Sequence, residues 1–112
     1  MKKDTPHIKE TFISSDVCIR GTIETKHSLV IEGKLLGNIK AENQLYIKEG
    51  ATIQGDVICE NLYLEGEIDG SAEVRSKSIL YKDSSISQGL ITSKLNINSK
   101  AKIKGGLTLK KN

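Results

Sequence analysis

The sequence predicts an all-β fold, a single parallel β-helix of about six coils. Three observations predict it: an internal repeat of about seventeen residues, apolar side chains at every second position within each repeat, and a glycine at a constant place in the repeat. The composition agrees, since isoleucine is frequent, aromatic residues make up 4% of the chain, and Pro6 is its only proline. No helical periodicity persists anywhere along the chain.

The first strand of each repeat carries two apolar residues separated by one position. The pairs are Leu29/Ile31, Leu45/Ile47, Leu62/Leu64, Ile79/Tyr81 and Leu95/Ile97, and their starts differ by 16, 17, 17 and 16 residues. Ile13 marks an earlier copy, so the copies begin near residues 11, 29, 45, 62, 79 and 95. Because strand side chains alternate between two faces, each pair is predicted to point inward.

A second strand follows in every copy, with its own inward residues. It reads Val17-x-Ile19-x-Gly21-x-Ile23, Leu35-x-Gly37-x-Ile39, Ile53-x-Gly55-x-Val57, Ile68-x-Gly70-x-Ala72, Ile86-x-Gln88-x-Leu90 and Ile103-x-Gly105-x-Leu107. A third inward position comes two residues later, at Thr25, Ala41, Cys59, Val74, Thr92 and Leu109. Three strands in about seventeen residues are too closely spaced for hairpins, so we interpret them as three sides of one coil.

The corners of the repeat support this interpretation. Glycine at the shared position of the second strand indicates a close backbone approach, although simple tolerance of small residues is an alternative. Small residues also precede the second strand, at Gly33, Ala51, Gly66, Ser84 and Ala101. The residues after the apolar pairs are Glu32, Lys48, Glu65, Lys82 and Asn98, a column in which stacked neighbours alternate in sign.

The sequence contains no recognisable catalytic, metal-binding or cofactor-binding constellation. The two histidines, His7 and His27, are too few for the three-histidine zinc site of β-helical carbonic anhydrases, and the strict six-residue spacing of hexapeptide acyltransferases is absent. Cys59 is predicted to be a small core side chain, and Cys18 to point outward. We therefore expect a protein that is not an enzyme.

Two surface features stand out. The residues between the apolar pairs are expected to stack into an outward apolar stripe of Phe12, Val30, Tyr46, Tyr63 and Leu80, ending at Asn96. Such a stripe fits lateral contacts or a partner, and plain strand propensity explains it equally well.

The second feature is charge segregation along the chain. Residues 1–83 hold 11 basic and 14 acidic side chains, whereas residues 84–112 hold six lysines and no acid. The resulting basic patch consists of Lys100, Lys102, Lys104, Lys110 and Lys111. It suits an anionic partner, or it serves as a charged cap against aggregation; without interleaved aromatic residues, nucleic acid is not expected.

The ends of the predicted coil have no capping element. We expect a short tail over residues 1–10, the β-helix over 11–109 and a second tail over 110–112. Each terminal coil would then present unpaired strands and apolar residues, which predicts end-to-end polymerisation without a nucleotide. The candidate interfaces are Ile103, Leu107 and Leu109 at the C-terminal end, and Ile13, Val17, Ile19 and Ile23 at the N-terminal end.

The chain resembles the bactofilins, a family of bacterial cytoskeletal polymers. The resemblance covers roughly Val17 to Leu109 and rests on "LVIEGKLLGNI", on "LYLEGEIDGSAEVRSKSI" and on the repeat length. It implies a right-handed, roughly triangular β-helix that forms non-polar filaments without nucleotide. It also implies partners among peptidoglycan-modifying enzymes or envelope proteins, and an influence on cell shape.

The location expected for this protein is the cytoplasm, because no apolar signal segment follows Met1 and no run of 18 apolar residues occurs. Some bactofilins carry a membrane-binding N-terminal peptide, so a weak peripheral association with the inner face of the membrane is left open. The alternative function is a non-polymerising β-helical module that captures a partner through the stripe.

Overall fold

The computed structural model describes residues 10–110, which form fifteen strands and no helix. The predicted N-terminal tail, apart from Glu10, lies outside the described residues, as do His7 and Lys111. The strands are β1 (Glu10–Ile13), β2 (Cys18–Arg20), β3 (Ile23–Thr25), β4 (Ser28–Ile31), β5 (Lys34–Leu36), β6 (Ile39–Ile47), β7 (Thr52–Gln54), β8 (Val57–Leu64), β9 (Glu67–Asp69), β10 (Ser71–Leu80), β11 (Ser85–Ile86), β12 (Gly89–Thr92), β13 (Lys94–Ile97), β14 (Lys102–Ile103) and β15 (Gly106–Leu109).

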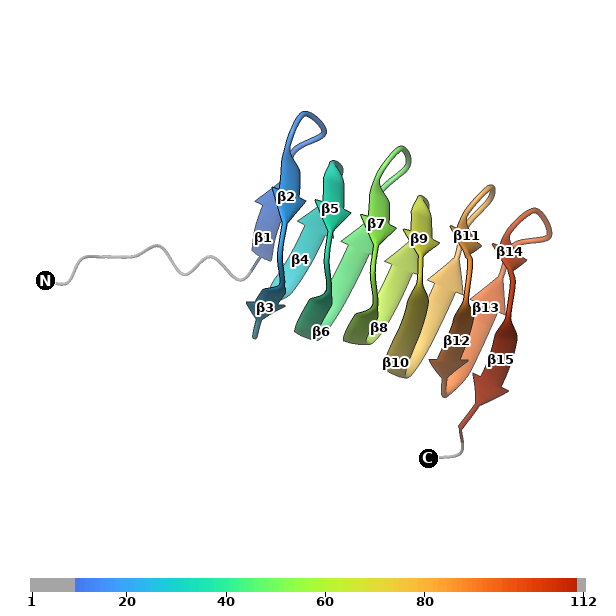
Figure 1. The fold of residues 1–112 in the computed structure, drawn as a ribbon. Helices are drawn as coiled ribbons and strands as arrows, with labels where there is room; N and C mark the ends of the chain where they lie inside the picture. Colours follow the sequence, from blue (N-terminus) through green and yellow to red (C-terminus); the bar gives the residue numbers. More distant parts are fainter. Residues whose placement is uncertain (1–9, 111–112) are drawn as a thin grey trace, which may run out of the picture.

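The strands stack as the coils of a parallel β-helix, which confirms the predicted fold class (Figure 1). One sheet runs in the order β1-β4-β6-β8-β10-β12-β15, with β3 paired to β6 and β13 to β10. The second sheet runs in the order β14-β11-β9-β7-β5-β2, and every pairing is parallel. The long strands β6, β8 and β10 each form the third side of one coil and continue into the first side of the next.

The core is a set of columns in which equivalent inward residues lie on one another in successive coils. Ile19, Leu35, Ile53, Ile68, Ile86 and Ile103 form one such column, in register across the second sheet. Its four inner members are 0–1% exposed. Because each coil is too thin to bury these side chains alone, the apolar core is continuous along the axis.

The register of the fifth coil differs from the prediction. Leu62 and Leu64 lie opposite Ser78 and Leu80, so Ile79 points outward and Tyr81 is 40% exposed. The shift arises because two residues, Arg75 and Ser76, turn the corner where the previous coil uses one. The apolar alternation of Ile79 and Tyr81 concealed it, since a serine was not expected in the core.

Ser78 is accommodated by a hydrogen bond within the core. Its hydroxyl donates to Thr92 Oγ1 at 2.9 Å, and Thr92 Oγ1 lies 3.0 Å from the carbonyl oxygen of Lys94. Both side chains are fully buried, and a buried hydroxyl costs little only when it is paired in this way. The shift also puts Tyr81 where Lys82 was predicted, so the alternating charge column holds only through Glu32, Lys48 and Glu65.

The corner between the first and second sides alternates between a protruding turn and a tight bend over the first five coils, and the sixth coil has a second turn in succession. Residues 14–17, 48–51, 81–84 and 98–101 form turns closed by a backbone hydrogen bond from the last residue to the first. These turns stand out at one edge in Figure 1, where the bends between β4 and β5 and between β8 and β9 are tighter. A Cβ at Gly33 would lie 2.4 Å from the carbonyl oxygens of Ser14 and Val17. The backbone of the tight bend therefore packs directly against the turn of the preceding coil.

The recurrent glycine of the second strand sits at a close backbone contact, as predicted. A Cβ at Gly37, Gly55 or Gly70 would lie 1.8, 1.9 or 2.0 Å from the carbonyl oxygen of the glycine one coil earlier. Gly55 has a φ of 153°, in the region that side chains rarely adopt. In the fifth coil, where Gln88 replaces the glycine, the positive φ moves to Gly89, at 155°.

Candidate functional site

The last coil exposes apolar side chains at positions that are buried in the preceding coil. Ile97, Leu107 and Leu109 are 43%, 48% and 59% exposed, respectively. The residues beneath them in the same columns are Leu80, Leu90 and Thr92, which are 0–1% exposed. The strands β13, β14 and β15 pair with the preceding coil on one edge only, so the other edge carries backbone groups without a strand partner in residues 10–110.

The sequence-based list of the C-terminal surface was incomplete. It named Ile103, Leu107 and Leu109 but omitted Leu95 and Ile97, which lie in the same open coil. The repeat itself could have identified them, because both had already been assigned as inward residues. With Leu95 and Ile103 half-buried, the surface consists of five apolar side chains on three strands.

The first coil is less exposed than expected. Val17 is 38% exposed, and Ile19 and Ile23 are half-buried at the open edges of β2 and β3. Ile13 departs from the prediction of an open apolar face, because it lies opposite Ile31 and is only 8% exposed within the core. The two ends therefore differ, and the larger open apolar surface belongs to the C-terminal coil.

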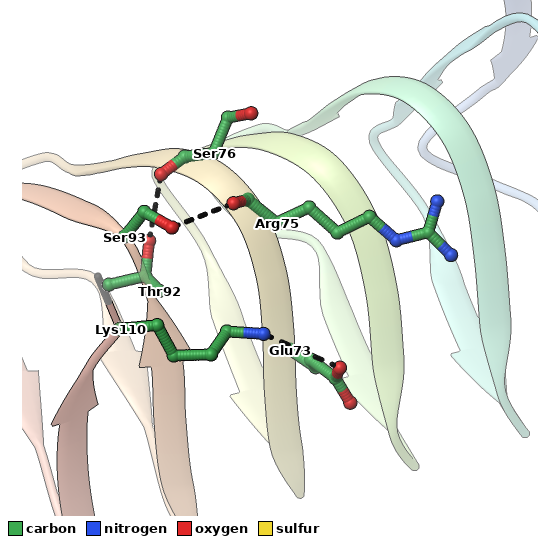
Figure 2. Close-up of polar contacts among 6 residues, drawn as sticks. All are labelled: Glu73, Arg75, Ser76, Thr92, Ser93 and Lys110. Carbon is green, nitrogen blue, oxygen red and sulfur yellow. Dashed lines mark hydrogen bonds and ion pairs between the residues drawn. The ribbon is translucent and has the colours of Figure 1, made fainter. Parts of the chain in front are cut away.

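Polar contacts join the corner after β12 to the corner within β10, and Lys110 of the last coil to Glu73 of β10, as Figure 2 shows. Ser93 Oγ donates to the carbonyl oxygen of Arg75 at 2.8 Å, and Thr92 Oγ1 lies 3.5 Å from that of Ser76. Lys110 Nζ reaches Glu73 at 3.8 Å across a partly exposed surface. β15 itself is held by its ladder with β12, while its inward side chains Leu107 and Leu109 remain exposed.

The outward stripe exists, with two corrections. Phe12 is 57% exposed, and the rings of Tyr46 and Tyr63 stack with centroids 4.6 Å apart and planes 11° apart. Leu80 is wrong as a stripe residue, because the register shift buries it and puts Ile79 in the column. Val30 is only 8% exposed, since it lies in register between the larger side chains of Phe12 and Tyr46.

The basic patch surrounds a hollow on the second sheet. Lys100, Lys102 and Lys104 line a recess of about 320 Å³ together with Ser84, Ser85, Ser87, Glu67, Asp83 and Ile86. Lys110 lies apart on the third side, where it pairs with Glu73. The three remaining described lysines thus form one cationic ridge along turn 98–101 and β14.

The cysteines match the prediction for their exposure. Cys18 is exposed and Cys59 is buried, and both are free thiols. Burial, and to a smaller extent the carboxylate of Glu60, raises the pKa of the Cys59 thiol to about 12, so it stays protonated at neutral pH. Residues 10–110 contain no group of three or more His, Cys, Asp or Glu side chains that could hold a metal ion. They also contain no helix able to cross a membrane.

The comparison with known families decides which class of β-helix this is. The family model for bactofilin, described as polymer-forming cytoskeletal, matches residues 11–108. This chain belongs to the bactofilin family. The continuous core and the open terminal coils described above are therefore those of a bactofilin.

A curated relative supports the assignment. This bactofilin is similar to Bactofilin BacO of Myxococcus xanthus, with 24% identity over 108 residues, which cover 96% of this chain and 86% of BacO. No solved structure matches the chain significantly. Membership in a polymer-forming family gives the chain a cytoskeletal, self-associating role.

Proposed function

We propose that this bactofilin polymerises end to end, coil on coil and without a nucleotide, through the apolar surface of its last coil. One observation carries the proposal. Leu107 and Leu109 are about half exposed in columns whose other members are buried, and the edges of β13 to β15 lack a strand partner within the described chain. A terminal coil of a second copy would supply strand partners for the open edges and would cover the exposed leucine side chains.

The energetics favour apolar burial over charge repulsion. Fully burying a leucine or isoleucine side chain contributes roughly 1.5–3 kcal/mol to the free energy of association. Ile97, Leu107 and Leu109 are about half exposed, so each contributes about half of that. The cationic ridge opposes contact between two C-terminal coils. Exposed charges are screened over about 8 Å at physiological salt, whereas apolar burial is not screened. The end contact should therefore strengthen as salt rises.

The substitution Leu107→Lys tests the end contact. The added charge should block any joint through the last coil, and sedimentation distinguishes the possible outcomes. Dimers joined through the first coil indicate a non-polar filament, and monomers indicate a head-to-tail filament. Thr108→Lys is the matched control, because it adds the same charge on the outward side of β15 and should leave filaments intact. Full-length filaments of Leu107→Lys would contradict the proposal.

The cellular role that fits such a filament is a scaffold for cell-wall or envelope-modifying proteins that influences cell shape. The aromatic pair Tyr46 and Tyr63 supports it, because the pair lies on the side of the coil and stays accessible when the ends are joined. The proposed location is the cytoplasm, with a peripheral association at the inner membrane face as a further option.

The stripe also supports the second candidate, a discrete binding module that does not polymerise. Electron microscopy of the purified protein separates the two, because the scaffold requires filaments and the module gives separate particles. The double substitution Tyr46→Ser with Tyr63→Ser tests the stripe itself. It should leave filaments intact and reduce capture of envelope proteins in a pull-down. Unchanged capture would remove the stripe from the proposal.

A further inference from the structure

The cationic ridge carries three positive charges against two carboxylates in the recess that it lines, Glu67 and Asp83. Within residues 10–110, no ion pair engages the ammonium groups of Lys100, Lys102 or Lys104. Lys100 sits in the protruding turn 98–101, Lys102 follows on β14, which is an open edge strand, and Lys104 comes directly after β14. The ridge therefore presents three exposed ammonium groups beside that recess.

A recess of opposite charge lies on the same molecule. The tight bend at Gly66 falls between the protruding turns 48–51 and 81–84, and this leaves a hollow of about 340 Å³. Its lining carries three carboxylates against one ammonium group: Glu49, Glu65 and Asp83 against Lys82, with Tyr81 and Asn98 completing it. None of the three carboxylates forms an ion pair within the described part of the chain.

We propose that the cationic ridge of one copy docks into this acidic recess of a second copy, and that the contact joins bactofilin filaments side by side. The inference rests on the proposed filament, because it concerns how filaments associate. The ridge begins on a protruding turn and is basic, and the recess is hollow and acidic. Since the two patches differ, a single contact is heterologous and leaves one patch free on each molecule, so it can propagate through a bundle.

Repetition along the filament makes a weak contact sufficient. An exposed ion pair contributes only about 0–1 kcal/mol, too little to join two isolated copies. When many ridges face many recesses along two filaments, each additional contact forms at a high effective concentration. Raising the salt from about 0.1 M to about 1 M shortens the screening length from about 10 Å to about 3 Å. Bundles should therefore disperse into single filaments as salt rises, whereas the end contact strengthens.

Charge reversal in two separate variants tests the docking directly. Glu49→Lys with Glu65→Lys makes both patches basic, and Lys100→Glu with Lys102→Glu makes both acidic. Each variant alone should form single filaments, seen by electron microscopy, and lose the low-speed pellet that reports bundles. Mixing the two kinds of filament should restore the pellet, because the basic ridges of the first variant again meet acidic recesses on the second.

A matched pair of variants controls for net charge. Glu24→Lys with Glu42→Lys, and Lys34→Glu with Lys40→Glu, change the formal charge from +3 to +7 and to −1, as the test variants do. All four control positions are exposed and lie outside the ridge and the recess. These variants should bundle separately as the unmodified protein does. Bundling that depends on mixing the control pair, or that survives in either test variant, would overturn the inference. Absence of filaments in the unmodified protein would instead refute the proposed function.

Discussion

The last coil and the coil beneath it have the same apolar pattern and opposite accessibility. Leu90 and Leu107 face one another in register, yet Leu90 is 1% exposed and Leu107 is 48% exposed. The same contrast separates Leu80 at 1% from Ile97 at 43%. The comparison teaches that in a β-helix an inward position becomes core only when a coil lies on both sides of it.

A polymer-forming protein can use this difference directly. The terminal coil is built by the same rules as the inner coils, so its open face already has the shape and the ladder of a core layer. The first coil is a weaker version of the same surface, because Ile13 is buried and Ile19 and Ile23 are half-buried. Substitutions at equivalent positions of inner and terminal coils can therefore separate folding from assembly.

The largest effect is expected from a charge placed in the core. Ile53→Lys should prevent folding, because Ile53 is fully buried and an unpaired ammonium group there costs several kcal/mol, comparable to the stability of the domain. Ile97→Lys adds the same charge in the open coil and should leave a folded, β-rich protein with impaired assembly. Circular dichroism and thermal melting check both variants. A cooperatively melting Ile53→Lys protein would show that this column is not core.

Truncating the paired leucines should separate stability from polymerisation. Leu90→Ala should lower the free energy of unfolding by about 2–5 kcal/mol, the usual cost of a cavity at a buried leucine. Leu107→Ala should cost the subunit less, because about half of that side chain is in water, and should raise the concentration needed for filaments. Urea unfolding and sedimentation measure the two quantities. Equal losses of stability would show that the two coils are equally packed.

The glycine column offers the same contrast in the backbone. A Cβ at Gly55 would lie 1.9 Å from the carbonyl oxygen of Gly37, whereas a Cβ at Gly21 meets no atom within 4 Å. Both residues have positive φ, which alone costs roughly 1–3 kcal/mol for alanine. Gly55→Ala should therefore reduce the melting temperature more than Gly21→Ala does. The reverse order would contradict the close stacking of these corners.

The two cysteines provide the most local test. Because burial raises the pKa of Cys59 to about 12, from 9.0, its contribution to stability is complete below pH 9 and declines as the pH rises toward 12. The decline should approach about 1.4 kcal/mol per pH unit within that window. Cys59→Ala should remove this component of the pH dependence, measured by urea unfolding. Cys18→Ala is the control and should retain it, since Cys18 is exposed.

Much of this architecture could be predicted from the sequence because the signals are local and repeated. The period, the inward columns at Ile53 and Leu64, the corner glycines and the buried Cys59 all follow from side chains that recur in every coil. Resemblance to the bactofilins was equally accessible, since the motif around Leu29 to Ile39 is contiguous. Leu107 and Leu109 were likewise recognisable as inward residues, because they occupy the positions of Leu90 and Thr92 in the repeat.

What only the tertiary structure decided depends on how neighbouring coils meet. The extra corner residue before the fifth coil moves Leu80 into the core and Tyr81 to the surface. The apolar pattern around Ile79 does not indicate this change of register. Ser78 is a polar residue, so the sequence favours a surface position for it. Its burial is tolerated because Thr92, fourteen residues later, accepts its hydrogen bond. The acidic recess beside Gly66 likewise exists only because a tight bend lies between two protruding turns. Sequence periodicity determines which residues belong to a column, whereas packing between coils determines the register, the pairing of buried polar groups and the shape of the surface.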